Sequence, residues 1–129
     1  MAAATVFIVD DDPSVRASLT RLMCASGYKA VAFADAEAFL DHVERNGTAP
    51  ACVVLDLHLP GRCGLELQQV INRREPRVPV VVLTGSECVR ELAAARAAGA
   101  LKVLKKPCDP AVLLAAVASA AQPPPPAST

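Results

Sequence analysis

Apolar runs of four to six residues recur along the chain, separated by longer segments in which apolar residues return every three or four positions. Within the first run the apolar residues follow one another instead of alternating with polar ones, which is typical of a strand covered on both faces. We therefore expect five strands, at residues 5–9, 29–33, 52–57, 79–84 and 101–104.

The segments between these runs carry helix signals. Asp12 precedes Pro13, and Asp109 precedes Pro110, so a capping carboxylate stands before a proline that fits the first helical turn. Asp35 is predicted to cap a further helix. Helix ends are predicted at Gly27, at Asn46-Gly47, before Pro76 and Pro79, and at Gly99. The predicted apolar faces are Val15, Leu19, Leu22 and Met23; Phe39, Leu40 and Val43; Leu67, Val70 and Ile71; the Ala-rich segment 89–98; and Leu113, Leu114 and Val117.

This alternation of strands and helices predicts an α/β fold. A parallel sheet would carry helices on both faces, joined by right-handed crossovers. We expect one domain over residues 1–121, followed at residues 122–129 by "QPPPPAST", whose prolines cannot continue a helix and favour an extended linker or tail. In sheets of this class, ligands bind outside the carboxyl ends of the strands, so the polar residues there are the first candidates for function.

Composition narrows the class of protein. The 129 residues include 13 basic and 13 acidic side chains, and a net charge of zero predicts neither a nucleic-acid nor a membrane partner. No apolar run approaches the ~20 residues of a membrane span, and no secretory signal is present, so we expect a cytoplasmic protein. The five cysteines have no metal-ligand spacing and are interpreted as unpaired thiols. Cys52 is predicted to lie in the core, and Cys63 and Cys108 beside turns.

Polar residues follow four of the five predicted strands. Asp10 and Asp11 follow the first strand, Asp56 lies near the end of the third, Thr84 ends the fourth and Lys106 follows the fifth. Carboxylates brought together at one edge of a sheet repel one another unless a cation lies among them. Three aspartates without histidine or cysteine form a set that Mg²⁺ prefers.

A metal, a lysine and a hydroxyl beside a carboxylate supply what phosphoryl transfer to an aspartate requires. Asp56 is the predicted nucleophile, because it stands alone at the end of a buried strand, whereas Asp10 and Asp11 form a pair suited to a metal. Lys106 would neutralise charge on the transferred group, and Thr84 would donate a hydrogen bond to it. Asp12 is interpreted as a helix cap only.

The chain resembles the receiver domain of two-component response regulators. The resemblance covers about residues 4–121 and rests on "IVDDDPSVR", "VVLDLHLPGRCGLEL", "VVVLTGS" and "VLKKP", in this order. It implies a flavodoxin-like doubly wound sheet of five parallel strands in the order 2-1-3-4-5, with five helices. "FADAEAFL" further resembles the regulators whose receivers are joined to helix-turn-helix output domains.

The resemblance also implies roles for individual residues. Asp10 and Asp11 correspond to the acidic pair that binds Mg²⁺, Asp56 to the phosphoacceptor, Thr84 to the switch hydroxyl and Lys106 to the lysine of the site. In the family, the backbone carbonyl two residues after the phosphoacceptor also ligates the metal, and here that residue is His58. The Lys106-Pro107 bond is typically cis in the family, and Gly85 is suitably small beside the phosphoryl pocket.

Two positions depart from the family pattern. Val103 replaces the Tyr or Phe that usually stands three positions before the lysine, and Cys108 replaces the Phe that commonly follows the Lys-Pro pair. The phosphorylation chemistry does not require either aromatic ring, but the usual aromatic switch is not expected. Of the histidines, His42 is interpreted as an exposed polar residue on a helix, and the His58 side chain either alters water access to Asp56 or is simply exposed.

A receiver domain would act as a switch and would catalyse only its own phosphorylation and dephosphorylation. Its partners would be a sensor histidine kinase or phosphotransfer protein, with an output domain after the tail or a homodimer also open. Two other functions stay open: a phosphorylation-independent interaction module, suggested by Val103 and Cys108, and a small aspartate-based phosphohydrolase using Asp10 and Asp12. The second leaves Asp56 without a role.

Overall fold

The computed structural model describes residues 4–46, 49–61, 63–74 and 78–121. Five parallel strands form one sheet in the order β2-β1-β3-β4-β5, which confirms the predicted fold class and strand order. Their bounds are β1 (Thr5–Val9), β2 (Lys29–Phe33), β3 (Cys52–Leu55), β4 (Val80–Thr84) and β5 (Lys102–Lys105).

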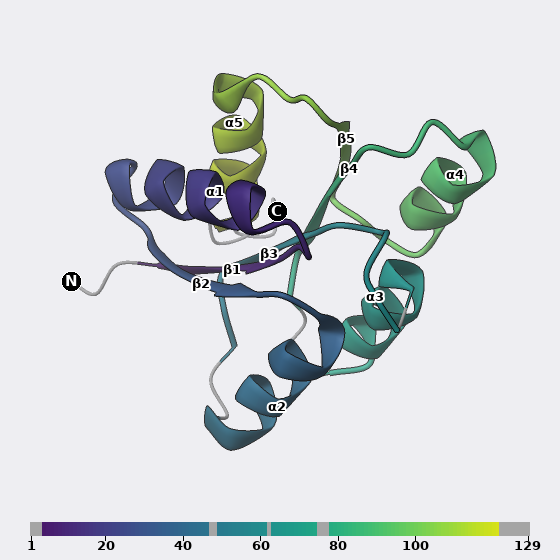
Figure 1. The fold of residues 1–129 in the computed structure, drawn as a ribbon, viewed down its shortest axis with the longest axis horizontal. Coiled ribbons are helices and arrows are strands. Elements are labelled where there is room, and N and C mark those ends of the chain that lie inside the picture. The colour runs from purple at the N-terminus through teal and green to yellow at the C-terminus, as the bar shows by residue number, and fades with distance from the viewer. Residues whose placement is uncertain (1–3, 47–48, 62, 75–77, 122–129) are drawn as a thin grey trace, which may run out of the picture.

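Five helices connect the strands and cover both faces of the sheet. They are α1 (Pro13–Ala25), α2 (Ala36–Asn46), α3 (Gly64–Asn72), α4 (Val89–Ala97) and α5 (Pro110–Ala121). Helices α1 and α5 lie on one side of the sheet, and α2, α3 and α4 lie on the other (Figure 1). None of the helices in the described ranges is long and apolar enough to cross a membrane.

Each face of the sheet has its own apolar core, because consecutive residues of a strand point to opposite faces. Phe7 and Val9 of β1 pack with residues of α2 and α3. Val6 and Ile8 of the same strand pack instead with residues of α1 and α5. The three central strands are buried almost throughout, as their uninterrupted apolar runs predicted.

Hydrogen bonds confirm the predicted helix caps at Asp12 and Asp35. The Asp12 carboxylate accepts hydrogen bonds from the backbone N–H groups of Ser14 and Val15, with Pro13 in the first turn. Asp35 Oδ1 accepts one from the N–H of Ala38 at 2.8 Å. Asp12 is thus occupied as a cap and is not part of the acidic cluster of Asp10, Asp11 and Asp56 described below.

Several strand bounds differ from the predicted ones by one or two residues. Strand β3 ends at Leu55 instead of residue 57, because the Leu57 carbonyl accepts a hydrogen bond from the N–H of Gly64 and leaves the ladder. Asp56 therefore follows the strand instead of lying within it. Strands β4 and β5 each begin one residue later than predicted. The predicted helix end at Gly47, the break at Pro76 and the tail at residues 122–129 lie outside the described residues.

His42 was predicted to be exposed, and this prediction is wrong. Its ring is half-buried and lies 5.4 Å from the ring of Phe7 and 5.2 Å from that of Phe33, measured between centroids. The three phenylalanines of the chain, Phe7, Phe33 and Phe39, gather here in edge-to-face contacts, and the imidazole packs against two of them. Cys52 is buried as predicted, and burial raises the pKa of its thiol to about 12.

The start of α3 is pressed against the segment that carries Asp56. A Cβ atom placed on Gly64 would lie 2.5 Å from the carbonyl oxygen of Asp56 and 2.5 Å from the Cα of Leu57. Both contacts are with backbone, which cannot rotate away as a side chain could. Only glycine permits this close approach, which holds the loop after β3 against α3.

We expect Gly64→Ala to lower the free energy of unfolding by about 2 kcal/mol, because the added methyl group must displace the backbone beside Asp56. Chemical denaturation followed by circular dichroism measures the change. Gly85→Ala is the matched control, since a Cβ there would meet nothing within 4 Å. Equal stability of the two variants would contradict the steric argument.

Candidate functional site

The register of the sheet brings the predicted site residues to one edge. Val9 pairs with Leu55, so Asp10 and Asp56 leave neighbouring strands side by side. On the other side, the N–H of Lys106 donates to the carbonyl of Thr84 at 2.8 Å. Residues from four segments that are far apart in the sequence therefore meet at the carboxyl ends of the strands, as a parallel sheet requires.

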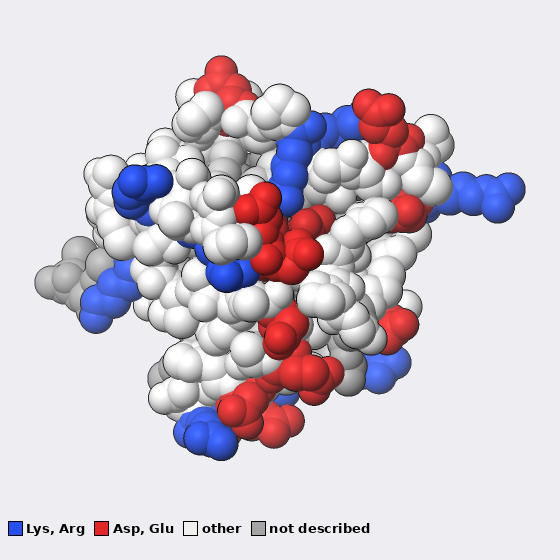
Figure 2. All heavy atoms as spheres, viewed as in Figure 1, with Lys and Arg blue, Asp and Glu red and all other residues white. Residues whose placement is uncertain are grey.

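Three carboxylates form the centre of this edge. Asp10, Asp11 and Asp56 each offer an oxygen atom, and these atoms all lie within 4.8 Å of one another. Asp10 is 2% exposed and Asp56 6%, whereas Asp11 is exposed. In Figure 2, acidic atoms gather near the middle of the face with a basic side chain beside them. The structure thus brings together the acidic set that was predicted.

Lys106 neutralises the two buried members of the cluster. Its Nζ lies 2.7 Å from Asp10 Oδ2 and 3.2 Å from Asp56 Oδ2. Burial of the ammonium group disfavours its charge, but the hydrogen bond and charge of Asp10, together with the charge and hydrogen bond of Asp56, outweigh burial and raise the pKa of Lys106 above its ordinary value. Lys106 therefore stays protonated and bridges the two carboxylates.

Backbone N–H groups hold two of these carboxylates in place, and an arginine holds the main chain at Asp10. Asp10 Oδ1 accepts a hydrogen bond from the N–H of Asp12 at 2.9 Å, and Asp56 Oδ1 accepts one from the N–H of His58 at 3.2 Å. The Arg16 guanidinium donates to the Asp10 carbonyl at 2.8 Å. The contact of Arg16 was not predicted. Its position one helical turn after the Asp12 cap is the signal that could have indicated it.

Thr84 is fully buried beside the cluster. Its hydroxyl oxygen accepts a hydrogen bond from the N–H of Ser86 at 3.1 Å, so in this conformation the hydroxyl is held by its own loop. The resemblance implied that Gly85 is suitably small beside the phosphoryl pocket, and a Cβ atom placed on it would meet nothing within 4 Å. Neither observation tests the roles predicted for these two residues.

The His58 side chain forms a contact that the sequence did not predict. His58 Nε2 lies 2.7 Å from Glu91 Oε2 on α4. The side chain of His58 is 60% exposed and that of Glu91 34%. The two residues are 33 positions apart, and no local pattern links them.

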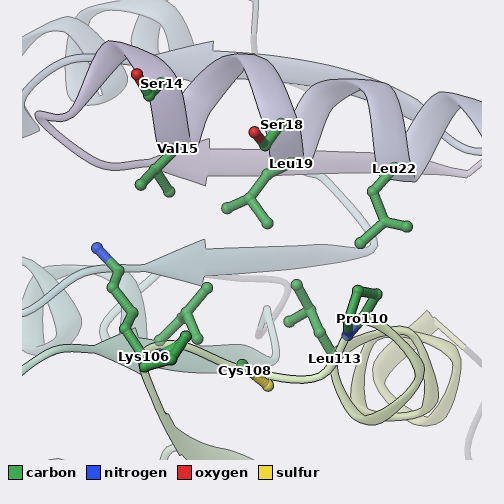
Figure 3. A pocket seen from close by; sticks show the side chains of 11 residues that line it. Ser14, Val15, Ser18, Leu19, Leu22, Lys106, Cys108, Pro110 and Leu113 are labelled. Carbon is green, nitrogen blue, oxygen red and sulfur yellow. The ribbon is translucent and has the colours of Figure 1, made fainter.

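An apolar groove of about 630 Å³ opens beside Lys106, between α1 and the start of α5. Val15, Leu19 and Leu22 point into it from α1, opposite Cys108 and Leu113 (Figure 3). Cys108, predicted to lie beside a turn, is half-buried in its wall. Because the Lys106 ammonium contacts Asp56 and its stem lines the groove, the groove is continuous with the acidic cluster.

The donor set fits a hard divalent cation. The cluster contains carboxylate oxygens and no histidine nitrogen or cysteine sulfur, and this chemistry suits Mg²⁺, which is bound through a few carboxylates while it keeps several waters. One of the three carboxylates is exposed, so the site can be reached from solvent. Whether the carbonyl of His58 completes the set stays a prediction.

A family model described as the response regulator receiver domain matches residues 6–118. The chain belongs to this family. It is a receiver domain of two-component signalling, in which phosphorylation of an aspartate is the typical mechanism. Domains of this family typically act in signalling and are not enzymes with a separate substrate.

Curated relatives agree with this membership. Nodulation protein W of Bradyrhizobium diazoefficiens is 38% identical over 114 residues, which are 88% of this chain and 49% of that protein. The transcriptional regulatory protein FixJ of Azorhizobium caulinodans is 38% identical over 115 residues, 87% of this chain and 52% of that protein. This receiver domain therefore spans about half the length of the curated relatives that it matches.

Solved structures share the fold. The chain is similar to the beryllofluoride-activated DrrB receiver domain, with a TM-score of 0.83 and 27% identity over 92% of this chain and 97% of that one. It is also similar to the response regulator StyR, with a TM-score of 0.80 and 34% identity over 94% of this chain and 60% of that one.

The departures of this receiver domain from the family pattern lie near Lys106. Val103 is half-buried and packs against the core on the α2 and α3 face of the sheet, and Cys108 lines the groove. The Lys106-Pro107 bond is cis, as the resemblance implied.

We expect Lys106→Met to lower the free energy of unfolding by about 2 kcal/mol at neutral pH in EDTA, because Asp10 and Asp56 lose the charge that compensates them. The pKa of Lys106 is raised by folding, so its contribution is complete below the ordinary value of 10.5 and is lost as the pH rises through the folded-state value. Denaturation curves at several alkaline pH values should show the two proteins converging.

The matched control is Lys105→Met, because Lys105 is exposed and lies 4.0 Å from the exposed Glu87. A pair of this kind contributes little to stability, so this variant should unfold as the parent does. A loss from Lys105→Met as large as that from Lys106→Met would contradict the role given to the buried ion pairs.

Proposed function

We propose that this receiver domain accepts a phosphoryl group on Asp56 from the phosphohistidine of a sensor kinase or phosphotransfer protein, in a Mg²⁺-dependent reaction. The single observation that carries the proposal is the position of Asp56. Its carboxylate lies among two further aspartates and a protonated lysine, at the strand edge where ligands of such folds bind. The membership in the receiver family supports the same assignment.

The metal would be held by the carboxylates of Asp10, Asp11 and Asp56 and by the backbone carbonyl of His58. When bound, Mg²⁺ supplies positive charge that stabilises the phosphoryl oxygens and relieves the repulsion between the aspartates. The donor chemistry of the cluster supports this assignment, since it offers oxygen atoms only.

The reaction then follows from the residues present. A carboxylate oxygen of Asp56 attacks phosphorus, the bond between phosphorus and the donor imidazole nitrogen breaks, and that nitrogen keeps the electron pair. Lys106, which already contacts Asp56 at 3.2 Å, neutralises charge on the transferred group. Thr84 turns from its present bond with Ser86 and donates its hydroxyl proton to a phosphoryl oxygen.

The output of the domain is part of the same proposal. Relatives of about twice this length, FixJ and TdiR, are named as transcriptional regulatory proteins. We therefore propose that residues 1–121 form the receiver and that residues 122–129 lead to an output domain that regulates transcription. We further propose that a second copy of the chain is a partner, in a homodimer of the phosphorylated protein. Because a regulator of transcription must reach the DNA, we also propose a cytoplasmic location.

We also propose that the phosphodonor protein contacts the groove between α1 and α5. The donor histidine must approach Asp56 within bonding distance, so its protein must cover the surface next to Lys106. The apolar wall formed by Val15, Leu19 and Leu22 begins at this lysine. Apolar side chains of a helix on the donor would fit a groove of this kind.

Acetyl phosphate with Mg²⁺ should add 80 Da to the protein, about the mass of one phosphoryl group, and EDTA or Asp56→Asn should abolish the addition, because both remove a group on which aspartyl phosphorylation depends. Intact-protein mass spectrometry measures it. Asp12→Asn is the matched control, since asparagine caps a helix as well as aspartate does.

Labelling that survives Asp56→Asn would overturn the proposed phosphoacceptor. Turnover of a phosphomonoester that needs Asp10 and Asp12 but not Asp56 would favour the phosphohydrolase. Partner binding that is indifferent to Asp56→Asn would favour the phosphorylation-independent module.

Val15→Asp should slow phosphotransfer from a phosphorylated histidine phosphotransfer protein at least tenfold and leave labelling by acetyl phosphate unchanged, because a buried charge in the groove opposes protein docking but does not touch the acidic cluster. Radiolabel transfer on gels measures both rates. Val112→Asp is the matched control, since Val112 is 50% exposed on α5 and lies outside this groove. Equal rates for the two variants with the protein donor would exclude the groove as the docking surface.

A further inference from the structure

Helix α4 has little apolar attachment to the rest of the fold. Of its nine residues only Ala95 is buried, and Val89 in its first turn is 78% exposed. Helix α3 has the same length, yet four of its residues are buried. The position of α4 therefore depends strongly on polar contacts, each of which contributes a small free energy and can be exchanged.

These polar contacts divide α4 into two parts. Its carboxyl end is fixed to α3: Gln68 Nε2 donates to the carbonyl of Ala95 at 2.9 Å, and the Asn72 side-chain amide donates to the carbonyl of Ala98 just after the helix. Its first turn is held by the contact of Glu91 with His58 at 2.7 Å. If that one contact opened, the first turn could move while the carboxyl end stayed in place.

His58 connects this first turn with the acidic cluster. Its backbone N–H donates to Asp56 Oδ1 at 3.2 Å, and its ring contacts Glu91. One residue thus touches the carboxylate that is proposed to be phosphorylated and the helix with the weakest packing. A shift of His58 at one of these contacts therefore moves the other, because only a few covalent bonds separate its N–H from its ring.

We propose that the His58–Glu91 pair is a clasp that holds α4 in the arrangement of the unphosphorylated protein, and that it opens when Asp56 carries a phosphoryl group. This inference rests on the proposed function, because it takes Asp56 as the phosphoacceptor. The phosphoryl oxygens compete for the donors around Asp56, the N–H of His58 among them, and the backbone shift withdraws the ring from Glu91. Glu91 and the His58 side chain are then positioning residues, which act through the loop and do not touch the phosphoryl group.

Thermodynamic linkage between the unphosphorylated and phosphorylated arrangements predicts whether removal of the clasp raises or lowers the affinity for a phosphoryl mimic. If the clasp exists only without the phosphoryl group, its removal favours the phosphorylated arrangement and any ligand that mimics it. Both side chains of the pair are partly exposed, so the contact stabilises its state only modestly. An affinity increase of about threefold is the expected size.

The test is the affinity of the full chain for beryllofluoride in the presence of Mg²⁺, followed by two-dimensional amide NMR. Glu91→Ala should bind about threefold more tightly than the parent. In the same titration the amide signals of α4 should move less than in the parent, because its first turn is already released. Signals of the loop after β3 should still move.

Three further variants separate a clasp from a simple change of charge. Glu91→Gln removes the charge but keeps an acceptor for the ring, so it should restore most of the parent behaviour. Glu87→Ala removes an equal charge from the loop before α4 and should bind as the parent does, since its pair with Lys105 is long and exposed. His58→Ala and the double variant with Glu91→Ala should match Glu91→Ala, because both residues form one contact.

The outcomes are distinct. Parent-like affinity of Glu91→Ala, or equal gains from Glu91→Ala, Glu91→Gln and Glu87→Ala, would overturn the clasp and leave the proposed function intact. If the parent itself does not bind beryllofluoride, or binds it equally after Asp56→Asn, the proposed function fails, and the clasp falls with it.

Discussion

The contact of Lys106 with Asp10 and Asp56 is the interaction on which the site depends. A parallel sheet places the carboxyl ends of its strands together, and here two of those ends carry buried aspartates. Two buried negative charges at this spacing would destabilise the fold without a cation. The ammonium group supplies one positive charge to both. It thereby keeps together the carboxylates that are proposed to bind a metal and to accept a phosphoryl group.

The same edge combines a rigid part with a loosely attached one. The close backbone contact at Gly64 holds the segment after β3 against α3, so the carboxylate of Asp56 has a defined place. Helix α4, a short distance along the edge, is anchored mainly by exchangeable hydrogen bonds. A change of charge at the rigid carboxylate can therefore be expressed as a movement of the helix, since the helix has few apolar contacts to lose.

Under the proposed function, the two faces of the sheet would serve separate steps: docking of the phosphodonor on one face and the response of α4 on the other. The groove between α1 and α5 is apolar and begins at Lys106, on the side proposed for the phosphodonor. Helix α4 lies on the opposite side of the sheet (Figure 1). Val103, where the family usually has an aromatic residue, is packed into the core of that side. With no large ring there, a response of α4 would be transmitted by its polar contacts instead.

Local patterns along the sequence were enough to predict the fold class, four of the five strands to within one residue, and the residues that meet at the acidic edge. Uninterrupted apolar runs, Asp-Pro helix starts and polar strand ends are local signals, and a parallel sheet converts their positions along the chain into one place in space. Other features were decided only by the tertiary structure: the partners of Lys106 and His58, the half-burial of His42, the early end of β3 and the groove beside Cys108. Each depends on distances between segments far apart in the chain, and hydrophobic period and capping patterns carry no information about such distances.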